Sequence, residues 1–574
     1  MAQSIEYSKV AEKYAKIEAT SGRLKIIDLF ADLIAMTPHN DIKPLVYLTT
    51  GRLAPAYEGV ELGVAEKTVL KILSSISSPE AVAKMMKKYG DAGEVAEKVI
   101  SQRITLSSGT LTLADVYSTL LKIVKQTGAN SVKLKSDLIS SLLSNATPEE
   151  AKYLVRSILT ELRLGVADYT VLEALTKVYG VGRDALERAY NLTSDLGLVA
   201  ALAASGAKAV DSVKIEVGRP IRPMLAERLE SADAVVAKVG KSASEYKLDG
   251  ERVQIHKDGD TIKIFSRSLE KITHYPDAEA LARKCIKARS VIVEAECVAV
   301  DSGGKYLPFQ ELMHRRRKYD VDEAAAKYPV TLNFFDVLLV NTDVTMTKPY
   351  TERRGALESI ITADKYARLM QRLITDDPAE IEDFMLKSLA DGGEGLMIKQ
   401  LNTPYTPGVR GFGWIKLKRE YNTSQVDSMD LVILGGFYGR GKRAGTFGAY
   451  LLGAVDNSTN GYVGVTKIGT GFTDQDLQDI PKSLHHVQTK PNDVESGMIP
   501  DAWVEPTTVM EVVASEITLS PTYTAAFNTI KQDAGLALRF PRFLRIRQDK
   551  TPQDATTVVE ITKMYNLQTK KMAR

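Results

Sequence analysis

The chain has 574 residues, which at roughly 150 residues per domain is enough for three or four domains. Its 75 basic and 72 acidic residues give a net charge of only +3, which excludes a protein basic over its whole surface but allows local basic patches. The longest nearly apolar run, Leu196 to Ala207, has 12 residues, fewer than the roughly 18–20 that span a bilayer. The charged N-terminus lacks the apolar stretch of a secretory signal, so we expect an intracellular, cytoplasmic protein with no membrane association.

The chain contains two cysteines, Cys285 and Cys297. Two thiols exclude both a disulfide framework and a zinc module built from four cysteines. The six histidines show no HExxH pattern, so a zinc hydrolase is not expected. We expect two buried thiols in a reducing compartment.

The first part of the chain is predicted to be helical. Apolar side chains recur at helical spacing in residues 23–36. Thr147 and Glu150 have the spacing of a capping box, with a proline at the first helical position. The apolar face of this second helix is expected to extend through Ile158 to Leu162.

Strand signals begin after a proline-rich linker at residues 217–223. Residues 253–264 alternate apolar and polar side chains on both sides of an Asp-Gly turn, which predicts a hairpin. Residues 290–300 and 330–340 are predicted to form largely buried strands. Short strands separated by glycines follow from residue 430 and favour a small β-barrel.

These patterns predict a multidomain protein with three parts. We expect an all-α domain over residues 1–217, an α+β domain over residues 218–424 and a β-barrel over residues 425–574.

The first chemical signal is the sequence EYKLDGER, residues 245–252. In an extended chain Glu245, Lys247 and Asp249 share one face. A lysine at the end of a strand, flanked by acids and followed by a glycine turn, is a candidate nucleophile. Taken alone, the motif could also be a chance surface sequence.

Carboxylates supply the next two signals. Glu294 and Glu296 point the same way from a mainly apolar strand, and burying both is costly unless a cation such as Mg2+ or a lysine meets them. The alternative is the exposed face of an edge strand. Glu394 follows a glycine-rich turn and opens another apolar strand, where a plain loop-to-strand junction is the alternative.

Two basic stretches are candidate phosphate sites. In residues 410–419, Lys416 and Lys418 alternate with apolar residues, so both ammonium groups lie on one face about 7 Å apart. Residues 539–550 carry five basic residues against one acid. Either stretch would suit a phosphate or a nucleic-acid backbone, and an exposed basic strand is the alternative for both.

In this order the motifs resemble those of the covalent nucleotidyltransferases. They are Lys-x-Asp-Gly-x-Arg, Phe-Ser-Arg (265–267), the Glu-x-Glu strand, Phe335-Asp336, Glu-Gly-Leu-Met-x-Lys and Trp-x-Lys-Leu-Lys. The closing Arg-x-Asp-Lys (547–550) and the helical front resemble the ATP-dependent DNA ligases of the archaeal replicative type. The resemblance spans nearly the whole chain. It implies a helical DNA-binding domain, an adenylation domain and an OB-fold domain.

The resemblance implies a nucleotide site around Lys247, the nucleophile that would carry AMP. Glu245 would contact the adenine and Phe335 would stack on it. The remaining nucleotide-binding residues would be Arg252, Arg267, Glu296, Arg410, Lys416 and Lys418. Neighbouring cations would favour the neutral, nucleophilic amine.

Glu296 and Glu394 would hold the metal ion, with Mg2+ and Mn2+ left as alternatives. The residues that would orient the pyrophosphate leaving group are Arg547, Asp549 and Lys550. One departure from the family pattern is Ala295, where many relatives have glycine. A small residue facing away from the site should have little effect there.

The implied reaction has three steps. The lysine attacks ATP, AMP passes to the 5′-phosphate of a nick in double-stranded DNA, and the 3′-hydroxyl then displaces AMP. The family acts in DNA replication, repair and recombination, and we expect a monomer. A sliding clamp is a further partner that the resemblance allows, although Gln102–Leu106 is too weak a signal to place its docking.

Three other interpretations compete with this one. An RNA ligase or capping-type nucleotidyltransferase would share the lysine motif, but minimal versions lack the helical front. An NAD-dependent ligase would need four cysteines for its zinc module. A non-catalytic nucleic-acid clamp would not need Lys247, Glu296 and Glu394 together. Tolerance of ADP, GTP or NAD and the growth temperature stay open.

Overall fold

The computed structural model describes residues 4–103, 110–315, 320–418, 428–440, 443, 445–459 and 461–572. The chain forms two compact units, one of Met1–Ile72 with Ala96–Arg419 and one of Leu73–Val95 with Glu420–Arg574. The first unit holds most of the expected helical domain together with the expected α+β domain, so the boundary at residue 217 stays a prediction. Residues 104–106 of the weak docking signal and Arg419 lie outside the described residues.

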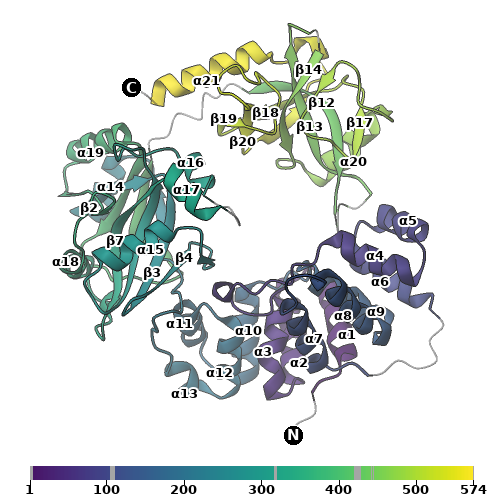
Figure 1. Ribbon diagram of the computed structural model, residues 1–574, viewed down its shortest axis with the longest axis horizontal. Coiled ribbons are helices and arrows are strands. Elements are labelled where there is room, and N and C mark those ends of the chain that lie inside the picture. The colour runs from purple at the N-terminus through teal and green to yellow at the C-terminus, as the bar shows by residue number, and fades with distance from the viewer. Residues whose placement is uncertain are drawn as a thin grey trace. The chain divides into compact units, whose positions relative to one another are not determined.

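The N-terminal part of the chain is helical (Figure 1). Its helices are α1 (Tyr7–Glu18), α2 (Arg23–Ala35), α3 (His39–Thr49), η1 (Ala56–Glu58), α4 (Glu66–Ile76), α5 (Pro79–Tyr89), α6 (Ala92–Ser101), α7 (Leu113–Val124), α8 (Ser131–Asn145), α9 (Pro148–Ile158), α10 (Asp168–Tyr179), α11 (Arg183–Thr193), α12 (Leu196–Ala204) and α13 (Ala207–Asp211).

Three sequence predictions can be checked on these helices. The helix expected over residues 23–36 is confirmed as α2, which ends at Ala35. The capping box at the start of α9 is confirmed, because the Thr147 side chain accepts from the Glu150 N–H and the Glu150 carboxylate from the Thr147 N–H. The extension of this helix to Leu162 is wrong. α9 ends at Ile158, and Thr160 adopts a φ of 56°, which a continuing right-handed helix does not allow.

Two sheets form the α+β part of the first unit. The first has the strand order β1-β11-β10-β2-β9 and the second β5-β4-β3-β6-β7-β8. The strands of the first sheet are β1 (Leu225–Leu229), β2 (Ser242–Leu248), β9 (Arg372–Thr375), β10 (Gly393–Gln400) and β11 (Arg410–Lys418). Those of the second are β3 (Glu251–Asp258), β4 (Thr261–Ser266), β5 (Lys271–Ile272), β6 (Ser290–Ala299), β7 (Val330–Val340) and β8 (Ala367–Leu369).

The strand predictions for this part are confirmed. The expected hairpin is β3 paired with β4, and the two expected buried strands are β6 and β7. Because β6 pairs with both β3 and β7, the edge-strand explanation of Glu294 and Glu296 is wrong.

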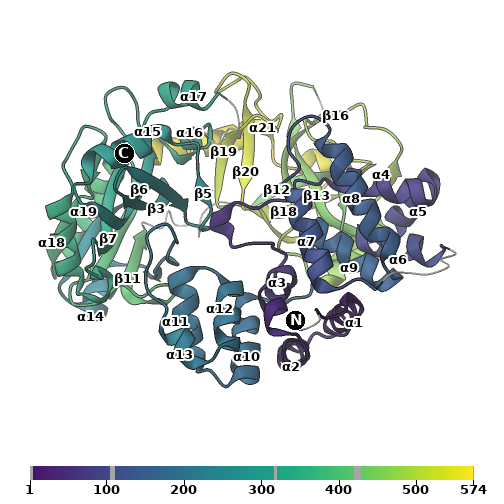
Figure 2. The same ribbon diagram turned by 60° about the horizontal axis from the view of Figure 1, so that its bottom comes forward.

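Helices cover the outer faces of the two sheets. α18 packs against β7 (Figure 2), and α19 packs against β10. The helices of this part are α14 (Ala232–Val239), α15 (Pro276–Cys285), α16 (Phe309–Met313), α17 (Val321–Lys327), η2 (Thr345–Thr347), α18 (Tyr350–Ile360) and α19 (Pro378–Ala390).

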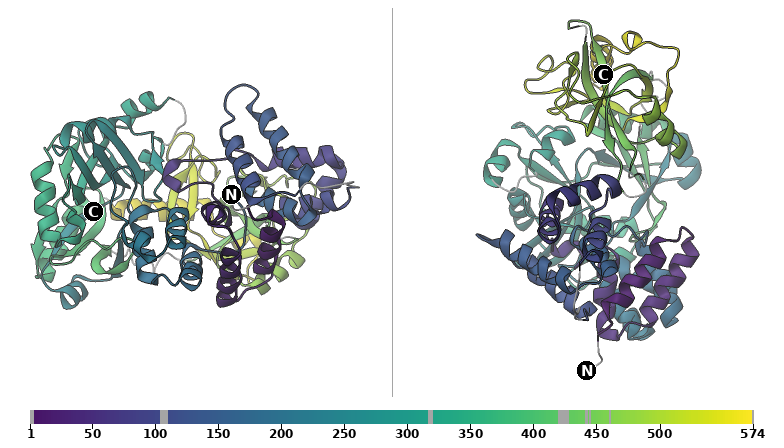
Figure 3. Two further views of the ribbon diagram at one scale, coloured as in Figure 1. Left: turned by 90° about the horizontal axis from the view of Figure 1, so that it is seen from below. Right: turned by 90° about the vertical axis from the view of Figure 1, so that its right-hand side faces the viewer.

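The C-terminal part of the chain is a β-structure, as expected (Figure 3), and it contains two clusters of buried apolar residues. Its main sheet has the order β15-β17-β12-β13-β14-β16, and β18 pairs with both β12 and β21. Its elements are β12 (Met429–Tyr438), β13 (Phe447–Asp456), β14 (Gly461–Ile468), α20 (Asp474–Ser483), β15 (His486–Val487), β16 (Val494–Glu495), β17 (Ala502–Val504), β18 (Val509–Val513), β19 (Glu516–Ser520), β20 (Gly535–Arg539), β21 (Arg542–Ile546), η5 (Pro552–Asp554) and α21 (Val558–Met572).

Cys285 and Cys297 are buried free thiols, as expected. No helix in the described part of the chain is long and apolar enough to cross a membrane.

Gly395 fixes how three strands of the first sheet meet. It pairs with Lys247 on β2 and with Lys418 on β11. Its φ is 142°, and a Cβ added there would lie 2.4 Å from the carbonyl oxygen of Leu417. Any side chain would therefore strain the backbone and push β10 away from β11.

We expect Gly395→Ala to lower the free energy of unfolding by about 2–4 kcal/mol, since backbone strain and a steric clash add together. Thermal or urea unfolding measures the change. Gly355→Ala, in the exposed part of α18 with no atom within 4 Å of the added Cβ, is the control and should be neutral or stabilising. Equal stability of Gly395→Ala and the unaltered protein would contradict the packing argument.

Candidate active site

A cavity of about 740 Å³ is lined by strands of both sheets of the first unit. The structure brings together here every site residue that the sequence predicted for this part of the chain. They are Glu245, Lys247, Arg252, Arg267, Glu296, Phe335, Glu394, Arg410, Lys416 and Lys418. Residues separated by more than 170 positions thus share one cavity.

Lys247 shares a carboxylate with Lys418 in this cavity. Its Nζ donates to Glu394 Oε2 at 2.6 Å, and Lys418 Nζ lies 2.5 Å from the same oxygen. Glu394 reaches both because it occupies a bulge, where the register between β10 and β2 shifts from Gly393 to Gly395. The sequence had indicated mainly cations beside the lysine, whereas its direct partner is an acid.

The pKa values of the nearby carboxyls are strongly shifted. Burial alone would raise the pKa of Glu394, but Lys247, a hydrogen bond from Asp249 and Lys418 together lower it to about 2. Burial and the hydrogen bond to Glu394 raise the pKa of Asp249 to about 6. Burial also raises the pKa of Glu296 to about 7, although Lys247 and Arg252 act against it. Such opposed shifts within one cavity are typical of functional sites.

The carboxylates of the cavity suit a metal ion that takes only one or two of its ligands from the protein. Among the described residues no group of three or more His, Cys, Asp or Glu side chains is placed to hold an ion. Mg2+ commonly binds one or two carboxylates and completes its shell with water and substrate phosphates. Glu296, a carboxylate in a cavity that raises its pKa, has the chemistry of such a ligand.

Arg252 is the cation that pairs with Glu294, one of the two carboxylates of β6. Its NH2 group donates to both oxygens of Glu294, at 3.0 and 2.8 Å, so the expectation of a cation partner is confirmed for this residue. The guanidinium lies 5.5 Å from the ring centroid of Phe335 and 5.0 Å from that of Trp414. Its Nε–H has no hydrogen-bond partner among the described residues, which leaves a buried donor at the cavity wall.

Other cations of the cavity lie close to one another. Lys416 has a lowered pKa, because it is partly buried and is repelled by Arg410, Lys418, Arg228 and Arg267. Cations that repel one another in a concave site create a positive potential that attracts anions.

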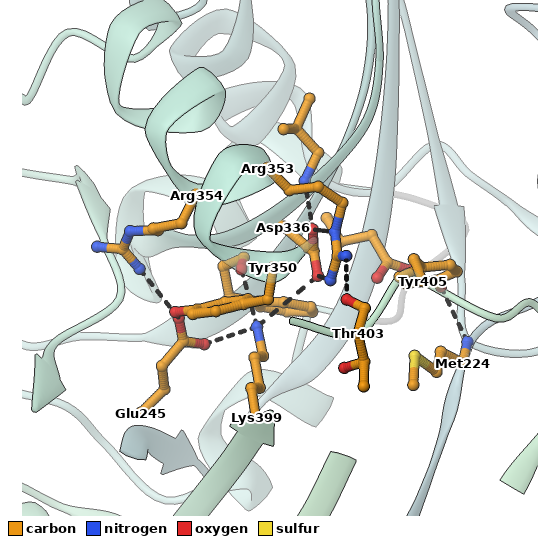
Figure 4. A network of polar contacts seen from close by, with 12 residues as sticks. Met224, Glu245, Asp336, Tyr350, Arg353, Arg354, Lys399, Thr403 and Tyr405 are labelled. Carbon is orange, nitrogen blue, oxygen red and sulfur yellow. Dashed lines mark hydrogen bonds and ion pairs between the residues drawn. The ribbon is translucent and has the colours of Figure 1, made fainter. Parts of the chain in front are cut away.

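Figure 4 shows a buried polar network, partly lining the cavity, that the sequence did not reveal. Glu245 contacts Tyr350 and Arg354 of α18 and Lys399 of β10. The motif that contains Lys399 was recognised, but no role was predicted for that lysine. No local signal marks the two α18 residues, because their partner lies more than 100 positions earlier in the chain.

The C-terminal unit holds its own cluster, centred on Asp430. Arg547 NH1 lies 3.0 Å from both oxygens of Asp430, and Lys550 Nζ lies 2.6 Å from one of them. Arg547 also donates to Asp549 at 2.9 and 2.7 Å. The three residues predicted to orient pyrophosphate therefore lie together, and the sequence missed the buried aspartate that joins two of them.

Comparisons with known proteins agree with this architecture. Three family models match: the DNA ligase N terminus at residues 6–176, the ATP dependent DNA ligase domain at 223–418 and the ATP dependent DNA ligase C terminal region at 443–550. The DNA ligase of Cenarchaeum symbiosum (strain A) is 43% identical over 99% of this chain and 98% of its own. The DNA ligase of Caldivirga maquilingensis is 44% identical over 99% of both chains.

A solved structure described as "Pmar-Lig_PreS3" has a similar fold, with a TM-score of 0.54 and 16% identity over 94% of this chain and 99% of that one.

A lysine-bearing cavity between two sheets, followed by a separate β-structure, is the architecture expected of a nucleotidyltransferase. The whole-chain matches narrow this class, and the chain belongs to the ATP-dependent DNA ligases. It seals nicks in DNA by forming phosphodiester bonds, with release of AMP and diphosphate from ATP. The matches favour this interpretation over an RNA ligase or a capping-type enzyme. Roles in DNA replication and repair are typical of the family.

The raised pKa of Glu296 predicts a pH-dependent cost to stability. The unfolded carboxyl loses its proton near pH 4.5 and the folded one near 7, so between these values the folded state binds more protons. Stability therefore falls as pH rises through this window, and the cost is complete above pH 7. We expect Glu296→Gln to be more stable than the unaltered protein at pH 8, by on the order of 1–3 kcal/mol, and less so at pH 5.

Thermal unfolding in metal-free buffer from pH 5 to pH 8 measures this difference. Glu61→Gln, which alters an exposed carboxyl outside the helices and strands, is the control and should show no gain that grows with pH. A gain for Glu296→Gln of the same size at both ends of the range would contradict the raised pKa.

Proposed function

We propose that Lys247 is the residue that carries AMP during nick sealing. The observation that carries this proposal is its place in the cavity, where it lies against Glu394 and shares the walls with Arg410, Lys416 and Lys418. A triphosphate drawn to these cations would bring its α-phosphorus to the lysine. The ammonium group first loses a proton to solvent, and the neutral amine then forms the N–P bond as the bond to pyrophosphate breaks.

The later steps reuse the same cavity. AMP passes from Lys247 to the 5′-phosphate at the nick, and the 3′-hydroxyl then attacks that phosphate and expels AMP. ATP and the nick must occupy the same cavity one after the other. We therefore propose that the C-terminal unit moves between these steps.

Four further residues of the cavity wall have proposed tasks in binding the nucleotide. Phe335 supplies an aromatic ring for stacking on the base, and it lies edge-on to Trp414 with ring centroids 6.0 Å apart. Glu245 accepts from the base. Arg252 and Arg267 donate to ribose and phosphate oxygens, and the unpartnered Nε–H of Arg252 is a suitable donor for this task.

We further propose that Glu296 and Glu394 hold a divalent metal ion together with phosphate oxygens of the substrate. When bound, the ion would neutralise part of the triphosphate charge and polarise the α-phosphate. Mg2+ is the proposed ion, and Mn2+, which also prefers oxygen ligands, is the alternative.

The C-terminal cluster is proposed to orient pyrophosphate during formation of the AMP adduct. Arg547 and Lys550 are cations that suit a phosphate, and Asp430 and Asp549 hold them in place. A monomer, an association with the nucleoid and a sliding-clamp partner also stay proposals of the family resemblance.

Lys247→Ala should abolish covalent labelling by ATP that carries a label on its α-phosphate, because no other group would form the N–P bond. A denaturing gel measures the label. Lys241→Ala, which alters an exposed lysine just before β2, is the control and should label normally. Equal labelling of Lys247→Ala and the unaltered protein would show that Lys247 does not carry AMP.

Arg547→Ala and Lys550→Ala should slow formation of the AMP adduct by about 100-fold or more, because charge-assisted contacts to the leaving group are lost. Sealing of a nick whose 5′-phosphate already carries AMP should change much less, since no pyrophosphate leaves in that step. Lys563→Ala, at an exposed position of α21, is the control. An equal loss in both assays would show that the cluster does not act on pyrophosphate.

A further inference from the structure

The carboxylate of Glu245 is held by side chains from outside its own strand. Its Oε1 accepts from the Tyr350 hydroxyl at 2.6 Å and from Arg354 NH1 at 3.0 Å, while Oε2 lies 2.7 Å from Lys399 Nζ (Figure 4). An ionised carboxylate offers about four acceptor positions. Three are taken by these contacts, and the position left over is on Oε2.

Tyr350 and Arg354 do not line the cavity, although Glu245 does. They lie one turn apart on α18, so both side chains leave the same face of the helix. Arg354 is fixed at its other end as well, because its Nε donates to Glu358 at 2.8 Å and its NH2 group to the Met370 carbonyl at 3.1 Å. Both residues thus act on the nucleotide site through other side chains: both hold Glu245, and the Tyr350 ring also lies 5.2 Å from Lys399 Nζ.

A second set of contacts fixes the third partner, Lys399. Its Nζ donates to the Phe335 carbonyl at 2.8 Å and lies 3.9 Å from Asp336. Asp336 is in turn held by two bonds from Arg353, at 2.8 and 3.1 Å. The whole cluster is buried, with exposed fractions of 1% for Glu245, Lys399 and Asp336. Buried charges in such a cluster are costly to keep unless each has a partner, and removing one partner leaves the other charge unmatched.

A carboxylate held through both oxygens turns less freely about its last bond than one held through a single oxygen. Without the contacts to Oε1, only the Lys399 contact to Oε2 would limit this otherwise broad rotation. With both contacts in place, the open acceptor on Oε2 keeps one direction. It can accept from an amino group on a base, but a carbonyl at the same place would set two acceptors against each other. Adenine carries an amino group at C6, and guanine carries a carbonyl there.

We propose that Tyr350 and Arg354 are positioning residues that set the preference for ATP over GTP by holding Glu245. The proposal rests on the contact between Glu245 and the base proposed above. It assigns a selectivity role to two residues of α18 that do not line the cavity.

Tyr350→Phe and Arg354→Lys test this, with covalent labelling of the enzyme by ATP and by GTP measured over a range of nucleotide concentrations. Each variant should lower the ATP-to-GTP ratio of labelling efficiency by about tenfold or more, as expected for the loss of one hydrogen bond to a charged group. The half-saturating ATP concentration should rise, while the maximal labelling rate with ATP should change by about twofold or less.

Glu352→Gln, which alters an exposed side chain on the same helix, should keep the ratio of the unaltered protein. Thermal unfolding of each variant accompanies the assay. If Tyr350→Phe and Arg354→Lys lose labelling equally with both nucleotides, the two residues only stabilise the fold and the proposal is overturned.

Glu245→Gln distinguishes the positioning role of Tyr350 and Arg354 from the proposed contact between Glu245 and the base. If Glu245→Gln lowers the ratio and the two α18 variants do not, Glu245 selects the base without their help and the positioning role is wrong. If Glu245→Gln also keeps the original ratio, Glu245 does not select the base, and its proposed contact falls together with the positioning role.

Discussion

The contact of Lys247 and Lys418 with one oxygen of Glu394 is the interaction on which the site depends. It exists because β10 carries a bulge at Glu394 and a glycine directly after it. A regular strand would turn Glu394 to the opposite face or leave it opposite a single neighbour. The glycine lets β11 approach closely, so one carboxylate can serve cations from two strands.

Charge is distributed differently at the back of the cavity and along its walls. At the back, Glu245 and Asp336 are matched by Lys399, Arg353 and Arg354, so the buried charges have partners. Along the walls, Lys416 faces other cations and Glu296 has a raised pKa. The paired charges at the back hold Glu245 and Asp336 in fixed positions. The arrangement along the walls leaves unmet charge where a triphosphate and a metal ion could supply the opposite sign.

Much of the fold and part of the site could be predicted from local sequence. Alternation with a period of two placed Lys416 and Lys418 on one face, and nearly continuous apolar runs located the buried strands that carry Glu296 and Phe335. The spacing of apolar residues gave the helices but not their ends. α9 stops before Leu162, because backbone geometry at Thr160 ends the helix.

The rest could not be predicted because it depends on contacts between distant segments. Asp430 lies more than 110 positions from Arg547, and Tyr350 lies 105 positions from Glu245. Neither Asp430 nor Tyr350 stands in a motif with a recognisable spacing. The motif residues meet the nucleotide site directly and can be recognised as a set, whereas the side chains that hold them in one orientation are chosen by packing. The selectivity of such a site is therefore distributed over residues that a list of motifs omits, and α18, which does not line the cavity, is part of the machinery that shapes it.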